Sequence, residues 1–288
     1  MQIEDALDAF VRQLEADGRS DHTIGQYQRH VRLFSRWLGD RDLGEVEHED
    51  VARFLSSDVV RGKRGGGARR PSSANAVRTS MRVFLGFAHD AGYAQSNPAR
   101  LVRRARCGAP PPRALSDAEE RRLVEVLEKG TDRAALRDRI LFLIMLRTGI
   151  RLGSALGLDV GDVDLEQGEL VLRQMKNNRE DRVFLPRAIR EDLRAWIGDR
   201  RSGPLFESYP GRRLGGRQAR RRFELILEAA GIDRVSGTHC LRHSFATSLY
   251  RKTSDLLLVQ SALRHASICS TTVYARASTD KLRRALGA

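Results

Sequence analysis

Residues suited to phosphate chemistry occur in the second half of the chain. Transfer of a phosphodiester needs fixed cations for the non-bridging oxygens, a proton donor for the leaving oxygen and a nucleophile, all held at one phosphorus. His239 and Arg242 are three residues apart, a spacing that puts both on one face of a helix. The candidates for the whole set of tasks are Arg151, Lys176, His239, Arg242, His265 and Tyr274.

Lys176 stands out because the chain otherwise favours arginine. Only five of its 51 basic residues are lysines. Arginine keeps its proton near neutral pH, whereas a partly desolvated lysine can release one, so Lys176 can protonate a leaving 5′-oxygen. Taken alone, a lysine in a turn is simply solvated, and residue type by itself leaves that alternative open.

Two other interpretations compete with the chemical one. His239 and His243 are four residues apart, which allows a zinc site. The glutamate of a HExxH motif is missing and no third ligand is evident, so we expect no metal and treat His243 as a supporting neighbour. Tyr274 alone would be a packing tyrosine with a solvated hydroxyl, and its spacing from His265 is what favours a chemical role.

The elements that position these residues fall into two predicted domains, since 288 residues exceed the usual size of one core. Apolar residues repeat at helical spacing near 3–14, 24–38, 48–58 and 72–91, which predicts a four-helix domain over residues 1–98. Pro98 and the prolines at 110–112 disfavour helix, so residues 99–113 are predicted to be an extended linker.

The second domain is predicted over residues 114–288 as mostly helical with a small β-hairpin. Ser116 and Glu119 form a capping box for a helix that runs to about Lys129. The apolar block 140–146 indicates a buried helix that stops at Gly149, with Arg151 directly after it. Runs at 170–175 and 182–185 predict the hairpin, with Lys176 at its turn, and the chain after residue 186 is helical apart from 204–206. The fold class is mainly α.

The charge of the chain favours a polyanionic partner. A formal net charge of +14 makes nucleic acid the leading candidate. The acid-free runs 61–70 and 100–106 hold nine of the 18 basic residues among positions 1–112. One such run is usually a solvated loop, but two suggest loops that follow phosphates. The predicted contacts are Arg61, Lys63, Arg64, Arg69, Arg70, Arg103, Arg104 and Arg106.

The remaining composition is that of a globular protein of the cytoplasm. No apolar run approaches the roughly 18 residues of a membrane span, and the start, MQIEDALDAF, has acidic residues where a signal peptide needs basic ones. Three widely spaced cysteines, at 107, 240 and 269, indicate reduced, structural thiols. We therefore expect a cytoplasmic, nucleoid-associated protein.

Three segments resemble motifs of the tyrosine recombinases, of the Xer and phage-integrase kind. TGIRLGSALGL resembles the first-arginine box, HCLRHSFAT the HxLRHxxAT box, and LRHASICSTTVY the LGHxxxxxTxxxY box. They occur in the family's order with the hairpin lysine between the first two. The resemblance covers nearly the whole chain and implies a SAM-like core-binding domain and a catalytic domain that close around duplex DNA. It also implies that the chain has no arm-binding domain.

The resemblance assigns a task to each candidate. It implies that Arg151 and Arg242 clamp the scissile phosphate while Tyr274 attacks it, giving a 3′-phosphotyrosyl link and a free 5′-hydroxyl. Lys176 is then the general acid. No metal or nucleotide cofactor is implied, because the phosphotyrosine conserves the energy of the phosphodiester for religation.

Of the remaining two candidates, His239 would assist proton transfer and His265 would hydrogen-bond a phosphate oxygen. The implied activity is site-specific strand exchange through a Holliday junction, for integration, excision or dimer resolution. The implied assembly is a homo-tetramer on two DNA sites, or a hetero-tetramer with a second recombinase.

Two positions depart from the family pattern. Ser154 stands where the family usually has an acidic residue, and Arg264 stands where it usually has glycine before the last histidine. Arg264 either contacts phosphate or lies in solvent. The alternative functions are a type IB topoisomerase-like relaxer, which the short chain disfavours, and an architectural DNA-binding protein without catalysis, which only Ser154 favours.

Overall fold

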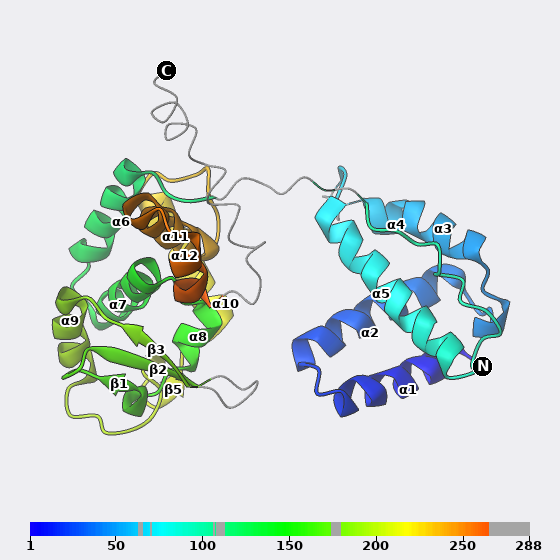
Figure 1. The fold of residues 1–288 in the computed structure, drawn as a ribbon, viewed down its shortest axis with the longest axis horizontal. Coiled ribbons are helices and arrows are strands. Elements are labelled where there is room, and N and C mark those ends of the chain that lie inside the picture. Colours follow the sequence, from blue (N-terminus) through cyan, green and yellow to red (C-terminus); the bar gives the residue numbers. More distant parts are fainter. Residues whose placement is uncertain (63–65, 70, 106, 108–112, 174–179, 265–288) are drawn as a thin grey trace, which may run out of the picture. The chain divides into compact units, whose positions relative to one another are not determined.

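The computed structural model describes the chain except for residues 63–65, 70, 106, 108–112, 174–179 and 265–288. It divides into two compact units, residues 1–108 and 109–288. Both units are mainly helical, as predicted (Figure 1). The small sheets lie only in the second unit among the described residues.

The first unit packs its helices around buried aromatic rings. Phe34 and Phe54 lie 5.0 Å apart between ring centroids, and Phe10 and Phe84 lie 5.6 Å apart. The predicted third helical segment is interrupted, because Ser57 adopts an extended conformation between α3 and α4. The helices are α1 (Ile3–Ala16), α2 (Asp21–Leu38), α3 (His48–Ser56), α4 (Asp58–Arg61) and α5 (Pro71–Asp90), with a 3-10 turn at Leu43–Glu45.

The chain that follows α5 packs back onto the first unit. Ala99 and Val102 are buried in its core. The buried side-chain amide of Asn75, on α5, forms two hydrogen bonds with the backbone of Ala105. Nδ2 of Asn75 donates to the carbonyl oxygen of Ala105 at 2.9 Å, and the N–H of Ala105 donates to Oδ1 of Asn75 at 2.8 Å. Part of the basic run 100–106 is therefore fixed to a helix of this unit.

The second unit is built around α7, whose apolar block is buried as predicted. This helix packs against α6, α8, α9, α10 and α11. The helices of this unit are α6 (Asp117–Lys129), α7 (Arg133–Thr148), α8 (Leu152–Gly157), α9 (Arg187–Ile197), α10 (Gly216–Ala229), α11 (His239–Thr253) and α12 (Leu256–Leu263).

The predicted hairpin is present as β2 (Glu169–Arg173) and β3 (Glu180–Phe184), which pair antiparallel. Leu170 pairs with Val183 on the buried face. A short strand, β1 (Val163–Asp164), joins β2 at its other edge, and a separate pair is formed by β4 (Glu207–Tyr209) and β5 (Arg212–Arg213). These two- and three-residue strands were not predicted, because they are too short to show an alternating pattern.

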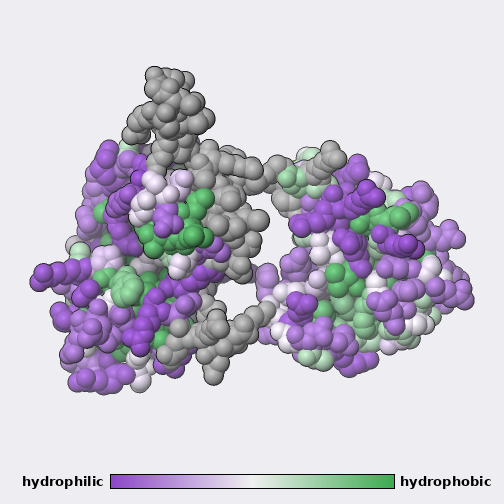
Figure 2. All heavy atoms as spheres, in the orientation of Figure 1, coloured by the Kyte–Doolittle hydropathy of each residue, from purple (hydrophilic) through white to green (hydrophobic). Residues whose placement is uncertain are grey.

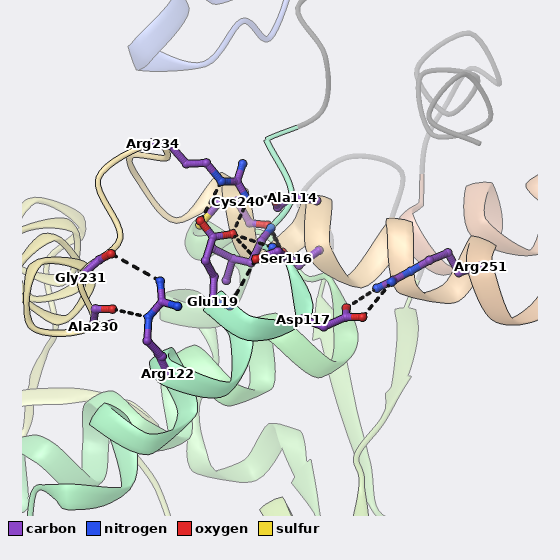
Figure 3. Close-up of polar contacts among 12 residues, drawn as sticks. Ala114, Ser116, Asp117, Glu119, Arg122, Ala230, Gly231, Arg234, Cys240 and Arg251 are labelled. Carbon is purple, nitrogen blue, oxygen red and sulfur yellow. Dashed lines mark hydrogen bonds and ion pairs between the residues drawn. The ribbon is translucent and has the colours of Figure 1, made fainter. Parts of the chain in front are cut away.

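Helix α6 begins at the predicted capping box and is held there by an arginine from a distant loop. Ser116 caps the backbone N–H of Glu119, and the Glu119 carboxylate accepts hydrogen bonds from the Ser116 backbone and from Arg234 (Figure 3). The Arg234 hydrogen bond is the main cause that lowers the pKa of Glu119 to about 2. The start of the second unit is thus anchored by charge as well as by packing.

Hydrophilic side chains cover most of the visible surface of each unit, and apolar side chains gather over α12 (Figure 2). The exposed apolar residues of that helix are Leu257 and Leu258. None of the described helices combines the length and the apolar composition that a bilayer-spanning segment needs.

Candidate active site and DNA-binding surface

A cavity of about 660 Å³ lies in the second unit where α8, β2 and the end of α12 meet. Arg151 and Arg242, 91 positions apart in the chain, both line it, as do Ser154 and Arg264. Two of the six predicted catalytic residues are therefore brought together by the fold. Both are permanent cations, so the cavity is suited to an anion.

The turn before Arg151 is favoured by the glycine at position 149. Gly149 ends α7 in the left-handed conformation, with φ at +68°. A Cβ atom at this position would lie 2.4 Å from Cδ1 of Phe245 and 3.0 Å from Leu263. The chain can then turn within two residues and start α8, for which Arg151 is the N-cap residue. The predicted helix stop is confirmed.

Arg242 lies on α11 and is buried, with a fractional exposure of 6%. Its Nη1 donates to the carbonyl oxygen of Gly149 at 2.5 Å, and its Nη2 donates to the carbonyl oxygen of Leu263. Both acceptors lie at the C-terminal ends of helices, α7 and α12, where the helix dipole favours a cation. Two directional bonds fix both the place and the plane of the guanidinium.

His239 and His243 share α11 with Arg242 but differ in their surroundings. His239 is the first residue of the helix and is exposed, whereas His243 is half-buried. Burial is the main cause that lowers the pKa of His243, and the charges of His239 and Arg242 add to it, so His243 is neutral near pH 7. No cluster of three or more metal-binding side chains occurs among the described residues.

The two departures from the family pattern both line the cavity. Ser154 is exposed there. Arg264 is not in open solvent: its side chain is 18% exposed, and its Nε lies 3.0 Å from Oδ2 of Asp181. Burial lowers the pKa of Arg264 and the charge of Arg151 lowers it further, whereas Asp181 acts in the opposite direction. Of the two alternatives for Arg264, the one that leaves its side chain in solvent is wrong.

The remaining candidates, Lys176, His265 and Tyr274, lie outside the described residues. The described residues that come just before them in the chain nevertheless line the cavity. Arg173 is the last described residue before the segment that contains Lys176, and Arg264 immediately precedes His265. The chain therefore enters both of these segments from the wall of the same cavity.

The first unit brings its two basic runs together. Arg61, at the end of α4, and Arg103, in the second run, line a cavity of about 220 Å³ with Arg78 of α5. Arg78 was missed, because it is a single cation within a helix and belongs to neither run. Arg69 donates its backbone N–H to the Arg61 carbonyl oxygen at 2.5 Å. Of the other predicted contacts, Arg104 is exposed, and residues 63, 64, 70 and 106 lie outside the described part.

The arginines of this cavity differ from those of the second unit in their partners. Within the described part of the chain, Arg61, Arg78 and Arg103 form no ion pair, whereas many arginines of the second unit are paired with carboxylates, such as Arg222 with Asp138 at 2.6 Å. Unpaired cations that converge from separate segments are suited to phosphate.

Comparisons with known proteins show what both units of the chain are similar to. Residues 113–281 match the phage integrase family, and residues 7–92 match the N-terminal SAM-like domain of phage integrases. The tyrosine recombinase XerC of Mycobacterium sp. (strain JLS) is 31% identical, over 98% of this chain and 97% of its own length. The tyrosine recombinase XerD of Mycobacterium leprae (strain TN) is 33% identical, over 91% and 89%. A crystal structure of the XerH site-specific recombinase bound to difH substrate, a pre-cleavage complex, is 26% identical with a TM-score of 0.74, over 96% of this chain and 83% of that one.

Proposed function

This chain belongs to the phage integrase family, and we propose that it is a site-specific DNA recombinase that cuts and rejoins DNA through a 3′-phosphotyrosyl intermediate. The observation that carries the proposal is the fixed position of Arg242. Its guanidinium is bound to the ends of two helices and lines the same cavity as Arg151. Two preorganised cations are what the transition state of phosphoryl transfer requires.

In the proposed reaction the hydroxyl oxygen of Tyr274 attacks the scissile phosphorus and the bond to the 5′-oxygen breaks. Arg151 and Arg242 bind the non-bridging oxygens, on which negative charge accumulates. The leaving 5′-oxygen takes a proton from Lys176, and the tyrosine proton leaves with the help of His239. His265 donates a hydrogen bond to a phosphate oxygen.

The reverse reaction completes strand exchange. The 5′-hydroxyl of a second strand attacks the phosphotyrosine, which releases Tyr274 and restores a phosphodiester. Because the number of phosphoester bonds is unchanged, the exchange needs no external source of energy. Lys176, as the neutral amine left by cleavage, takes up the proton of the incoming hydroxyl.

We assign residues 1–98 to a core-binding domain, 99–113 to a linker and 114–288 to the catalytic domain. The partner is double-stranded DNA, gripped by the first unit at Arg61, Arg78 and Arg103 among other contacts. We propose a tetramer on two DNA sites, either of identical chains or with a second recombinase. Because its substrate is DNA, the protein acts in the cytoplasm at the nucleoid.

Covalent capture tests the proposal and finds the DNA site at the same time. The full chain is incubated with nicked duplexes that carry a randomised core, so that cleavage near the nick releases a short strand and traps the enzyme. Adducts that resist denaturation are isolated and their DNA is sequenced. We expect one recovered core sequence, with the protein joined to a 3′-phosphate.

Tyr274→Phe is the control, because it removes only the attacking oxygen. We expect no adduct from this variant while its DNA binding is retained. An adduct from the variant would show that another residue is the nucleophile. Binding of DNA by the parent protein without any adduct would contradict the recombinase assignment and favour an architectural protein.

A further inference from the structure

We infer that Arg264 is a positioning residue that ties the β2–β3 hairpin to the end of α12, and so places the general acid relative to Arg242. The inference depends on the proposed function, because the acid in question is Lys176, which comes between β2 and β3 in the sequence and lies outside the described residues. Arg264 itself does not contact the reacting atoms in this role. It acts by holding two walls of the cavity together.

The contacts of Arg264 reach both walls. Its Nη2 donates to the backbone carbonyl oxygen of Arg182 at 2.8 Å, and its Nε forms the 3.0 Å ion pair with Asp181. Its Nη1 donates to the carbonyl oxygen of Ala262, in the last turn of α12. One planar group therefore joins β3 to α12 through two hydrogen bonds and one ion pair, a geometry that the rigid fork of arginine suits better than the ammonium group of lysine.

The neighbours of these contacts belong to the site already described. Leu263, directly before Arg264, gives its carbonyl oxygen to Arg242. On the other side, Asp181 pairs with Leu172 of β2, and Leu172 lines the cavity. Arg242 is thus connected to the hairpin through Leu263 and Arg264, which are adjacent in the chain. A shift of the end of α12 relative to β3 therefore changes the distance between Arg242 and the hairpin.

The position of Asp181 makes the link specific. Side chains alternate along a strand, and Val183 and Leu185 on the same face as Asp181 are buried, whereas Arg182 and Phe184 are exposed. Asp181 thus places a carboxylate on the inward face of β3, where Arg264 neutralises it. Arg182 points the other way and pairs with Glu169 across the hairpin at 2.8 Å.

The backbone of Arg264 has a conformation that is strained for a residue other than glycine. Arg264 is one of two described non-glycine residues with positive φ, at +54°. Glycine adopts this conformation without strain, and every other residue type pays for it. A glycine here would complete the α12 cap equally well, so the arginine has a task that the cap does not explain.

The test compares two scissile groups. Cleavage is measured under single-turnover conditions with the full chain on the recovered site, in a suicide duplex with either the natural 5′-oxygen or a 5′-bridging sulfur as the leaving atom. A thiolate is a far weaker base than an alkoxide and leaves without an acid. The variants are Arg264→Gly, Arg264→Lys and Asp181→Asn, with Lys176→Ala as the calibrating loss of the acid.

We expect Arg264→Gly to slow cleavage of the oxygen substrate by about 10- to 100-fold, and Lys176→Ala to slow it by more. Both should cleave the sulfur substrate at close to the parent rate. Arg264→Lys should restore only part of the lost rate. Arg182→Ala is the matched control on the same strand, because it removes an exposed ion pair on the opposite face and leaves the carbonyl acceptor, and it should cleave both substrates normally.

Other outcomes would show whether the role of Arg264, the role of Lys176 or the proposed function is wrong. If Arg264→Gly slows both substrates equally, Arg264 acts on the phosphate or on the fold, and the inference is wrong. The same holds if it slows neither. If sulfur does not rescue Lys176→Ala, Lys176 is not the acid and the inference fails, although the recombinase assignment stands. If the parent forms no adduct with either substrate, the proposed function itself is wrong.

Discussion

The Nη1 atom of Arg242 donates a 2.5 Å hydrogen bond to the carbonyl oxygen of Gly149, 93 residues earlier in the chain. Gly149 is two residues before Arg151, so one arginine of the cavity is bound to the turn that presents the other. A change in the turn must therefore move both cations. The pair behaves as one structural unit, and its geometry can be tested from either end.

Gly149→Ala should damage both stability and cleavage. A left-handed non-glycine residue costs about 1–2 kcal/mol, and the added methyl group would lie 2.4 Å from the Phe245 ring, so overpacking adds about 1–3 kcal/mol. Urea denaturation of the full chain measures the first effect, and the yield of covalent adduct on the cognate site measures the second. Gly161→Ala is the control, because φ there is not positive and nothing lies within 4 Å of its Cβ position. Equal stability of the two variants would contradict the strain argument.

Arg242→Lys should lower the rate of adduct formation by about 10²- to 10³-fold, the usual effect of losing one preorganised donor. Lysine keeps the charge but cannot hold the carbonyl oxygens of Gly149 and Leu263 in one plane. The same helix supplies the matched control: Arg251 forms an exposed ion pair with Asp117 at 2.7 Å, and Arg251→Lys should leave the rate unchanged. A normal rate for Arg242→Lys would mean that charge alone suffices and that planar geometry has no role.

The sequence predicted the local features of the site but not its long-range contacts. The capping box at Ser116 and the helix stop at Gly149 depend on neighbouring residues, and both were predicted correctly. The carbonyl partners of Arg242 and the link from Arg264 to β3 join segments 93, 21 and 82 residues apart, and no local pattern records such pairings. The sequence therefore predicted the candidate residues but not the contacts that hold them in place.

The same reason explains why Arg78 was missed and why Asp181 was not predicted as the partner of Arg264. Arg78 is isolated in sequence and becomes part of a cationic cluster only when α5 packs beside α4. The alternatives for Arg264, phosphate or solvent, omitted Asp181 because a carboxylate on the inward face of a strand cannot be located without the strand register. Register is a property of the fold, set by which face is buried.

The acid stability of the second unit should depend on Glu119. Its pKa in the folded protein, about 2, lies below the ordinary value of 4.5, so the ionised carboxylate stabilises the fold above pH 4.5 and this contribution is lost as the pH falls towards 2. At about 1.4 kcal/mol per pKa unit, the difference between 4.5 and about 2 corresponds to at most about 3.5 kcal/mol, because solvent screens the half-exposed Arg234. Glu119→Gln should be less stable than the parent by up to this amount at pH 6, and the difference should shrink steadily below pH 4.5.

The neighbouring pair in Figure 3 provides the comparison for this pH series. Asp117 also has a lowered pKa, mainly through its hydrogen bond from Arg251, but both side chains are more than half exposed. Solvent screens such a pair, so Asp117→Asn should change stability much less than Glu119→Gln. Urea unfolding at intervals between pH 6 and pH 3 measures both. A Glu119→Gln effect that is independent of pH would show that the carboxylate does not stabilise the fold through its charge.

The anchoring of the basic run 100–106 should depend on Asn75. Asn75→Ala removes both hydrogen bonds to Ala105, so the amide of Ala105 should lose its protection against hydrogen exchange while the amides of α5 keep theirs. Asn97→Ala, which removes a cap from the N–H of Ala99 in the same stretch, is the control and should leave Ala105 protected. Unchanged exchange at Ala105 in the Asn75 variant would mean that core packing alone holds the run.

The last prediction concerns the three arginines that meet in the first unit. If Arg61, Arg78 and Arg103 each bind a phosphate, changing all three to glutamine should lower the slope of log affinity against log salt by up to about 0.9 per lost contact. Arg19→Gln removes the same kind of charge from an exposed position outside this cavity and should leave the slope unchanged. The full chain is titrated with its site between about 50 and 200 mM salt. Because the net charge also falls, a lower affinity alone decides nothing. An unchanged slope in the triple variant would return these arginines to the role of solvated surface charges.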